Sequence, residues 1–145
     1  MATIIHDGAL ERLAADEWPG LVVKVGLLHE TSTAAPATTD EFVSDLIPAA
    51  NELVNDDYER LTLAGKVASL VSGAFELGAD TPNFGALTGA TLTQGVLTWF
   101  AYAHVTDDSD SWLIASRTFT SPVALNGTDV TIPWPDGVVL RLERS

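Results

Sequence analysis

The sequence has no cysteine. This absence excludes a disulfide scaffold, a thiolate nucleophile and thiolate metal sites, and it leaves the redox compartment open. Long hydrophobic runs are also missing, because the longest weakly polar segment, Gly95 to Val105, is far shorter than the roughly 20 residues of a membrane helix. The N-terminus, Met1-Ala2-Thr3-Ile4, has neither the basic nor the apolar region of a signal peptide. We therefore expect no membrane association and no signal peptide.

Basic residues are scarce. The chain has 7 Lys and Arg against 20 Asp and Glu, which gives a formal net charge of −13. The electrostatic field of such an acidic protein would repel a polyanion, so nucleic acid is not expected as a partner. Two explanations of the acidity remain open: it keeps the protein soluble, or it faces a partner surface with complementary positive charge.

The remaining composition is that of a globular protein, with 46% hydrophobic and 19% charged residues. A chain of 145 residues can bury roughly 68–70% of its unfolded surface in one core. No internal repeat, low-complexity tract or linker divides it. We therefore expect a single domain over residues 1–145.

The segment from Thr128 to Arg144 has the pattern of a β-hairpin. Alternating apolar residues flank a turn, and they are Val130, Ile132 and Trp134 before it and Val138, Leu140 and Leu142 after it. The turn is Pro135-Asp136-Gly137, in which Pro presets φ and Gly accepts a positive φ. Arg141, Glu143 and Arg144 are expected to face solvent.

Other segments are rich in β-branched and aromatic residues between turn signals. Strands are expected over Leu21–Leu28, Tyr58–Ala64, Lys66–Leu77 (one strand, or two broken near Ser72-Gly73), Thr91–Val105 and Trp112–Phe119. Loops are expected over Glu30–Thr39, Gly78–Thr88 and Asp107–Ser111, with a turn at Asn126-Gly127.

Two short helices are predicted. Asp7 can cap a helix over Gly8–Asp16, and Thr38 with Glu41 makes a capping box for a helical turn through Leu46. Ala49–Asp57 fits either a further short helix or a turn. Together these elements predict a mainly β fold, an antiparallel β-sandwich of jelly-roll or immunoglobulin type with one or two short helices.

The three histidines, His6, His29 and His104, do not have the spacing of a metal-binding helix. We expect His6 at a frayed terminus and the other two at strand ends. No zinc site is predicted.

Asp107, Asp108 and Asp110 have the alternating spacing of a calcium loop. Trp112 and Thr118 stand where such a loop needs Gly and Glu. A solvated hairpin tip is therefore the preferred interpretation.

Signatures of enzymes are missing as well. No G-x-S-x-G elbow is present, and Gly85–Gly95 lacks the Lys of a phosphate-binding loop. No sequence feature selects a pair of carboxylates for glycoside hydrolysis. We therefore predict no catalytic, cofactor-binding or metal-binding residue, and we expect that the protein is not an enzyme.

Four tryptophans, Trp18, Trp99, Trp112 and Trp134, allow two interpretations. They are core residues that supply large buried area, or they form a platform on which a sugar stacks if they are exposed.

The predicted pieces follow one another in an order that a known family shares. They are the N-terminal helix at Asp7–Asp16, the strand at Leu21–Leu28, the acidic turn Asp40-Glu41-Phe42-Val43-Ser44-Asp45-Leu46-Ile47, the segment Leu87-Thr88-Gly89-Ala90-Thr91, the strand ending Ile114-Ala115-Ser116, and Asn126-Gly127-Thr128-Asp129-Val130-Thr131-Ile132-Pro133-Trp134-Pro135-Asp136-Gly137. The last segment fits N-G-x-D-[IV]-T-[IV]-x-W-x-x-G. This order resembles the small structural proteins of tailed bacteriophages, in which a similar hairpin closes the chain. Pro133, in the last strand, departs from what we expect there and suggests an edge position or a bulge.

The resemblance implies a virion component, assembled in the host cytoplasm, that binds other virion proteins such as the major capsid, portal or tail proteins. Head decoration, head-spike and minor tail proteins are all of this kind. Our preferred expectation is a capsid-associated decoration or spike-base protein that forms a homo-oligomer. The alternative is a tail-associated or receptor-binding module that recognises a host glycan.

Overall fold

The computed structural model describes residues 4–6, 18–29, 36–47, 52–53, 57–71, 74–88, 94–95, 97–119, 123–124, 126–132, 134 and 137–143. Its strands are β1 (Ile4–Ile5), β2 (Val23–His29), β3 (Leu61–Thr62), β4 (Val67–Val71), β5 (Ala74–Gly78), β6 (Asn83–Thr88), β7 (Gln94–Gly95), β8 (Leu97–Ala103), β9 (Trp112–Thr118), β10 (Val123–Ala124), β11 (Asn126–Thr131) and β12 (Val138–Glu143). Helical structure is limited, within the described residues, to a 3-10 turn, η1 (Trp18–Gly20), and a short α-helix, α2 (Val43–Leu46).

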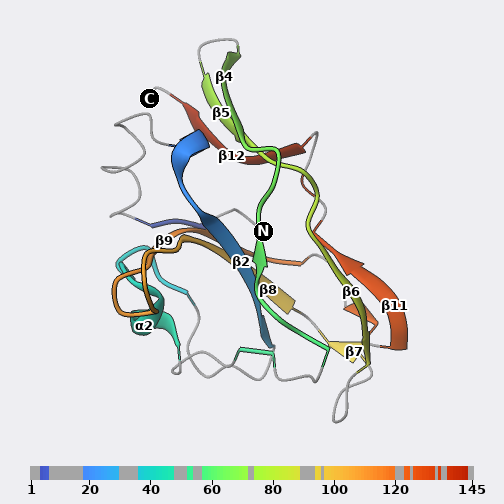
Figure 1. The fold of residues 1–145 in the computed structure, drawn as a ribbon. Helices are drawn as coiled ribbons and strands as arrows, with labels where there is room; N and C mark the ends of the chain where they lie inside the picture. The colour runs from blue at the N-terminus through green and yellow to red at the C-terminus, as the bar shows by residue number, and fades with distance from the viewer. Residues whose placement is uncertain are drawn as a thin grey trace.

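The strands form antiparallel sheets (Figure 1). The largest has five strands in the order β1-β9-β8-β2-β3, and a second has three in the order β12-β5-β4. Two strand pairs, β11-β6 and β10-β7, complete the described sheets. The predicted mainly β, sandwich-like fold is confirmed.

The centre of the five-stranded sheet is the pair β2 and β8, which runs without a break from Val23 opposite Ala103 to His29 opposite Leu97. Successive side chains of a strand point to opposite faces. Val25 and Trp99 therefore face one side, where both are buried. The strand predicted at Leu21–Leu28 is confirmed as β2, which ends one residue later. The prediction of one strand over Thr91–Val105 is confirmed for β8, but Gln94–Gly95 forms the separate strand β7, which pairs with β10.

The face that carries Val25 and Trp99 packs against the other sheets. The shared hydrophobic cluster takes Leu77 from β5, Leu87 from β6 and Val130 from β11, all nearly inaccessible to solvent. Burial of this apolar area is the main force that holds the two layers together. It explains why strands that are far apart in sequence lie against one central sheet.

The opposite face of the five-stranded sheet packs against α2. A second cluster of buried residues fills this contact, and its members are Leu28, Val43, Leu46, Phe100, Tyr102 and Leu113. The helix begins at Val43 because Phe42 is extended, with φ −112° and ψ 158°. The Asp45 carboxylate accepts hydrogen bonds from the backbone N–H groups of Glu41 and Phe42.

That capping arrangement corrects the prediction for Thr38 and Glu41. The helical turn lies where expected, but its cap is Asp45 reaching back to Phe42 rather than Thr38 reaching forward to Glu41. The predicted loop over Gly78–Thr88 is also wrong, because Asn83–Thr88 forms strand β6. Cross-strand pairing with β11 outweighs the local turn propensity of this segment.

The strands predicted within Lys66–Leu77 and at Trp112–Phe119 are confirmed as the β4–β5 hairpin and β9. Tyr58–Ala64 forms a strand only at Leu61–Thr62. Glu52 makes an isolated bridge to Leu28 within Ala49–Asp57.

The predicted C-terminal hairpin is wrong. β11 pairs with β6, whereas β12 pairs with β5, so the two strands belong to different sheets. The turn chemistry is nevertheless as expected, since Gly137 has φ 75°. The Gly137 carbonyl accepts a hydrogen bond from the Ala79 N–H, which directs the chain onto β5.

The residues of β11 and β12 keep part of the predicted pattern. Val130, Ile132 and Trp134 are all buried. In β12 a register shift between Val138 and Leu140 breaks the alternation, so that Val139 and Leu140 are both buried.

The predicted turn at Asn126-Gly127 is also wrong, because both residues belong to β11 and Asn126 pairs with Thr88. The expected helix over Gly8–Asp16, the break at Ser72-Gly73 and the strand position of Pro133 lie outside the described residues.

Candidate functional site

His6 is not at a frayed terminus. Its side chain is fully buried, and its backbone N–H donates to the Ile114 carbonyl of β9. Nδ1 lies 3.1 Å from the carbonyl oxygen of Asp40, which can only accept, so Nδ1 carries the proton. Nε2 lies 3.4 Å from the Ser116 hydroxyl. The imidazole therefore joins β1, β9 and the segment before α2.

The other two histidines lie where the sequence places them. His29 is the last residue of β2 and is buried, and His104 follows the last residue of β8. Among the residues that the structure describes, no group of three or more His, Asp or Glu side chains is placed to hold a metal ion.

The acidic segment Asp107–Ser111 connects β8 to β9, as predicted for a hairpin tip. Two of its carboxylates accept hydrogen bonds from the loop's own backbone. Asp107 accepts from the Ser109 N–H, and Asp110 accepts from the N–H groups of Thr106 and Asp107. These backbone hydrogen bonds lower the pKa of Asp110 below its ordinary value.

All four tryptophans are buried, at 1% exposure for Trp18, 5% for Trp99 and 7% each for Trp112 and Trp134. The interpretation as core residues is confirmed. None of the four indole rings is exposed as a sugar-stacking platform requires.

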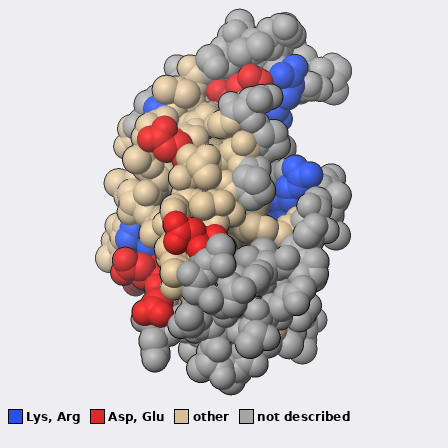
Figure 2. Space-filling view, turned by 90° about the vertical axis from the view of Figure 1, so that its right-hand side faces the viewer, with Lys and Arg blue, Asp and Glu red and all other residues tan. Residues whose placement is uncertain are grey.

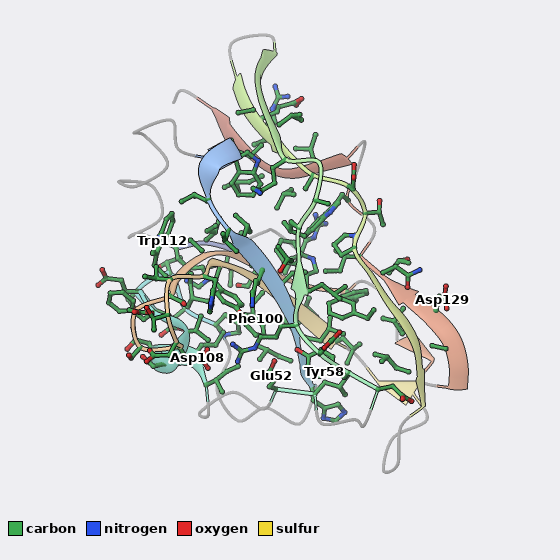
Figure 3. The ribbon with its side chains drawn as sticks, in the orientation of Figure 1. Glu52, Tyr58, Phe100, Asp108, Trp112 and Asp129 are labelled. Carbon is green, nitrogen blue, oxygen red and sulfur yellow. The ribbon has the colours of Figure 1, made fainter. Side chains whose placement is uncertain are left out.

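The polar groups that the fold does bring together surround Arg60. We call Glu52, Tyr58, Arg60, Tyr102 and Asp108 the Arg60 cluster. Figure 3 shows Glu52, Tyr58 and Asp108 gathered around Phe100, while Asp129 lies apart on β11. Arg60 lies over Phe100 and Tyr102, on the face of the five-stranded sheet that also carries α2.

Every N–H group of the Arg60 guanidinium has an acceptor. Nε and Nη2 donate to the two carboxylate oxygens of Glu52, each at 2.8 Å. Nη1 and Nη2 donate to the two oxygens of Asp108, at 2.6 and 3.1 Å. Nη1 also donates to the Tyr102 hydroxyl at 3.2 Å. Five donors thus make five hydrogen bonds, in two forked ion pairs.

The same guanidinium lies over aromatic rings. Its central carbon is 5.5 Å from the centroid of Phe100 and 5.3 Å from that of Tyr102. These rings are stacked on each other with centroids 5.8 Å apart. Cation–π attraction therefore adds to the ion pairs.

Gly26 makes room for this stack. It pairs with Phe100 across β2 and β8, and a Cβ atom at Gly26 would lie 2.5 Å from the Phe100 ring. The same Cβ atom would lie 2.9 Å from the Tyr58 hydroxyl. A glycine is required here because the aromatic ring rests on the backbone.

Tyr58 links Glu52 to strand β2. Its hydroxyl donates to the Glu52 carboxylate at 2.6 Å and accepts from the Leu27 N–H at 3.0 Å. Burial raises the pKa of the Tyr58 phenol far above its usual value, and the charge of Glu52 adds to this effect.

Tyr102 and Arg60 also keep their protons. Burial raises the pKa of Tyr102. For Arg60, burial by itself lowers the pKa, but the hydrogen bonds to Glu52, Asp108 and Tyr102 outweigh it and hold the pKa above its usual value. General acid–base catalysis works best with a pKa near the operating pH. The cluster is therefore suited to holding the structure together.

A hollow of about 800 Å³ opens beside the Arg60 cluster. Lys24, Tyr102 and His104 line it from the sheet, and residues 106–109 line it from the β8–β9 loop. It presents both signs of charge together with hydroxyl groups, which suits polar contacts with another surface.

The sequence contained little that points to the Arg60 cluster. Glu52 and Arg60 are eight residues apart, which is no motif spacing, and Asp108 is distant along the chain. One signal was available: an arginine in a chain with only seven basic residues and twenty acidic ones is a candidate for an ion pair. Tyr102 two residues after Phe100 also indicated an aromatic face.

No protein-family model matches the chain, and comparisons with curated proteins and with solved structures find no match. Of the helices that the structure describes, none is long and apolar enough to span a bilayer.

Proposed function

We propose that this protein is a structural component of a tailed-bacteriophage virion and acts by binding other virion proteins. Within that class we propose a capsid-associated decoration or head-spike-base protein that forms a homo-oligomer. The virion assignment comes from the sequence resemblance, and it rests on the order of residues in Asn126–Gly137 rather than on a hairpin at that place.

The observation that carries the binding role is the closed state of the Arg60 cluster. All five N–H groups of Arg60 are bound within the chain, and both phenols of the cluster keep their protons at neutral pH. Such a cluster fixes the β8–β9 loop and the segment of Glu52 on the central sheet. Because its polar groups are bound within the chain, we assign the contacts with other proteins to the rest of the protein surface.

The surface charge fits a partner with positive groups. The net charge is −13, and Figure 2 shows acidic side chains scattered over uncharged surface on the face in view. Complementary charge speeds the encounter of two proteins and sets their orientation more than it adds affinity. A repeated acidic subunit would therefore find a basic lattice site quickly.

The proposal is tested on purified phage particles. Antibodies raised against the protein are expected to label the heads in electron micrographs, and particles that lack the protein should release their DNA at a lower temperature. Labelling confined to tails would contradict the head assignment while keeping the virion role. Absence of the protein from purified particles, or turnover of a substrate by the isolated chain, would contradict the whole proposal.

A further inference from the structure

The outer edge of β4 differs from the other strand edges that the structure describes. Natural sheets protect their edges with short strands, charged side chains, proline, bulges or a covering helix or loop, because an open edge pairs with another chain. β1 and β3 have two residues each, and the β11–β6 pair has register irregularities. β12 carries Arg141 and Glu143.

β4 has no charged residue, proline or bulge, and among the described strands only β5 is hydrogen-bonded to it, while η1 contacts it. It has five residues, Val-Ala-Ser-Leu-Val, without charge or proline, and its register with β5 is continuous from Val67 to Val71. It stands at the end of the order β12-β5-β4. Val67 at its start is 59% exposed, the most exposed of the large hydrophobic residues in the described chain. Figure 1 shows the β4–β5 hairpin at the top, away from the five-stranded sheet.

We propose that β4 pairs antiparallel with β4 of a second copy of this chain, about a two-fold axis at Ser69. The three-stranded sheets of two copies would then form one continuous sheet of six strands. This inference specifies the self-association within the proposed function, but it rests on the strand edge and does not depend on the virion assignment.

The residue order favours a second copy over a foreign strand. A two-fold axis at Ser69 places Val67 opposite Val71 of the other copy and the small Ala68 opposite the larger Leu70. The same strand is thus its own complement, as an interface between identical subunits requires. Backbone groups of alternate residues point away from β5, so this register lets them make ladder hydrogen bonds between copies.

The distribution of charged residues also favours pairing of two copies at the β4 edge. Two copies with a net charge of −13 each repel one another over most of their surface. β4 has no charged residue, and the two strands beside it hold one basic residue, Arg141, and two acidic ones, Glu76 and Glu143. Glu76, which stands next to Ser69 in register, is paired with Arg141 at 3.0 Å. The edge strand is therefore uncharged on an acidic molecule.

The test uses the absence of cysteine. In the Ser69→Cys variant the single thiol would lie directly opposite its symmetry mate, at a Cα separation of about 4.5–5.5 Å that a disulfide can bridge. With oxidised glutathione this variant is expected to form a covalent dimer in high yield. Thr81→Cys, a matched change at an exposed position outside β4, should stay monomeric. A mixture of Val67→Cys and Val71→Cys should give the mixed dimer, which reports the register.

Sedimentation equilibrium tests the uncrosslinked protein. The mean mass of the wild type should rise with concentration from 15.4 kDa toward twice that value. Ser69→Lys places two like charges face to face and should abolish the rise, whereas Thr81→Lys makes the same charge change elsewhere and should not.

Equal crosslinking of Ser69→Cys and Thr81→Cys, or a mass that stays at that of one chain at every concentration, would overturn the proposal. A monomer would point to a strand of a different protein at this edge. It would leave the virion assignment to be decided by the antibody labelling.

Discussion

Trp99 and Trp134 meet edge to face between the two layers, with ring centroids 4.9 Å apart and planes at 88°. Trp99 belongs to β8 in the five-stranded sheet, and Trp134 follows β11. The indole N–H of Trp134 donates to the carbonyl of Asp80 at 3.2 Å. This contact fixes the end of β11 on the core before the chain turns at Gly137 onto a different sheet.

Trp134→Ala is therefore expected to lower the free energy of unfolding by about 3–5 kcal/mol, because it removes a buried indole and leaves a cavity beside Trp99. Denaturant unfolding followed by circular dichroism measures the change. Thr131→Ala, at an exposed position of β11, is the control and should alter stability by less than about 0.5 kcal/mol. A loss below about 1 kcal/mol for Trp134→Ala would contradict the assigned packing.

Gly26→Ala is expected to destabilise the protein by about 1–3 kcal/mol, because the new methyl group would overlap the Phe100 ring. Gly20→Ala is the matched control, since nothing lies within 4 Å of a Cβ atom there. Phe100→Leu in the Gly26→Ala background should recover part of the loss, and the double-mutant cycle measures that coupling. Equal effects at both glycines would show that the ring does not rest on Gly26.

Arg60→Met is expected to lower stability by about 1–3 kcal/mol, a value reduced from that of a fully buried pair because Glu52 and Asp108 retain some exposure to solvent. The cost arises mainly from two carboxylates left without their partner. Arg141 is more exposed than Arg60, so Arg141→Met, which breaks the pair with Glu76, should cost less than about 1 kcal/mol. Adding Glu52→Gln to Arg60→Met should restore part of the stability. If it restores nothing, the ion pairs do not hold the cluster.

The two tyrosines of the chain, Tyr58 and Tyr102, predict how stability depends on alkaline pH. Both have a pKa raised mainly by burial, so the folded protein keeps phenolic protons that the unfolded chain releases. Their contribution is complete below the unfolded pKa of about 10 and is lost as the pH rises above it. Tyrosinate absorbance should therefore appear together with unfolding, and not as a separate titration of the native protein. Reversible ionisation near pH 10 without loss of circular dichroism would contradict the buried cluster.

Local patterns predicted the strands whose burial is continuous. β2 and the paired β8 are each buried at six of seven positions, because both faces of the central sheet are covered. A nearly continuous run of apolar, β-branched and aromatic residues between turn signals indicates such a strand without knowledge of its partner. Gly137 was predicted for the same reason, because a turn that needs a positive φ selects glycine locally.

The sequence by itself determined the mainly β class, the central strands, the acidic β8–β9 tip and the apolar character of Val130, Ile132 and Trp134, because each follows from side chains close together in the chain. Tertiary structure alone decided that β11 and β12 separate to pair with β6 and β5. It also decided that Arg60 joins Glu52 to Asp108. Strand partners and long-range ion pairs depend on which surfaces the collapsed chain buries together, and no local spacing encodes that choice.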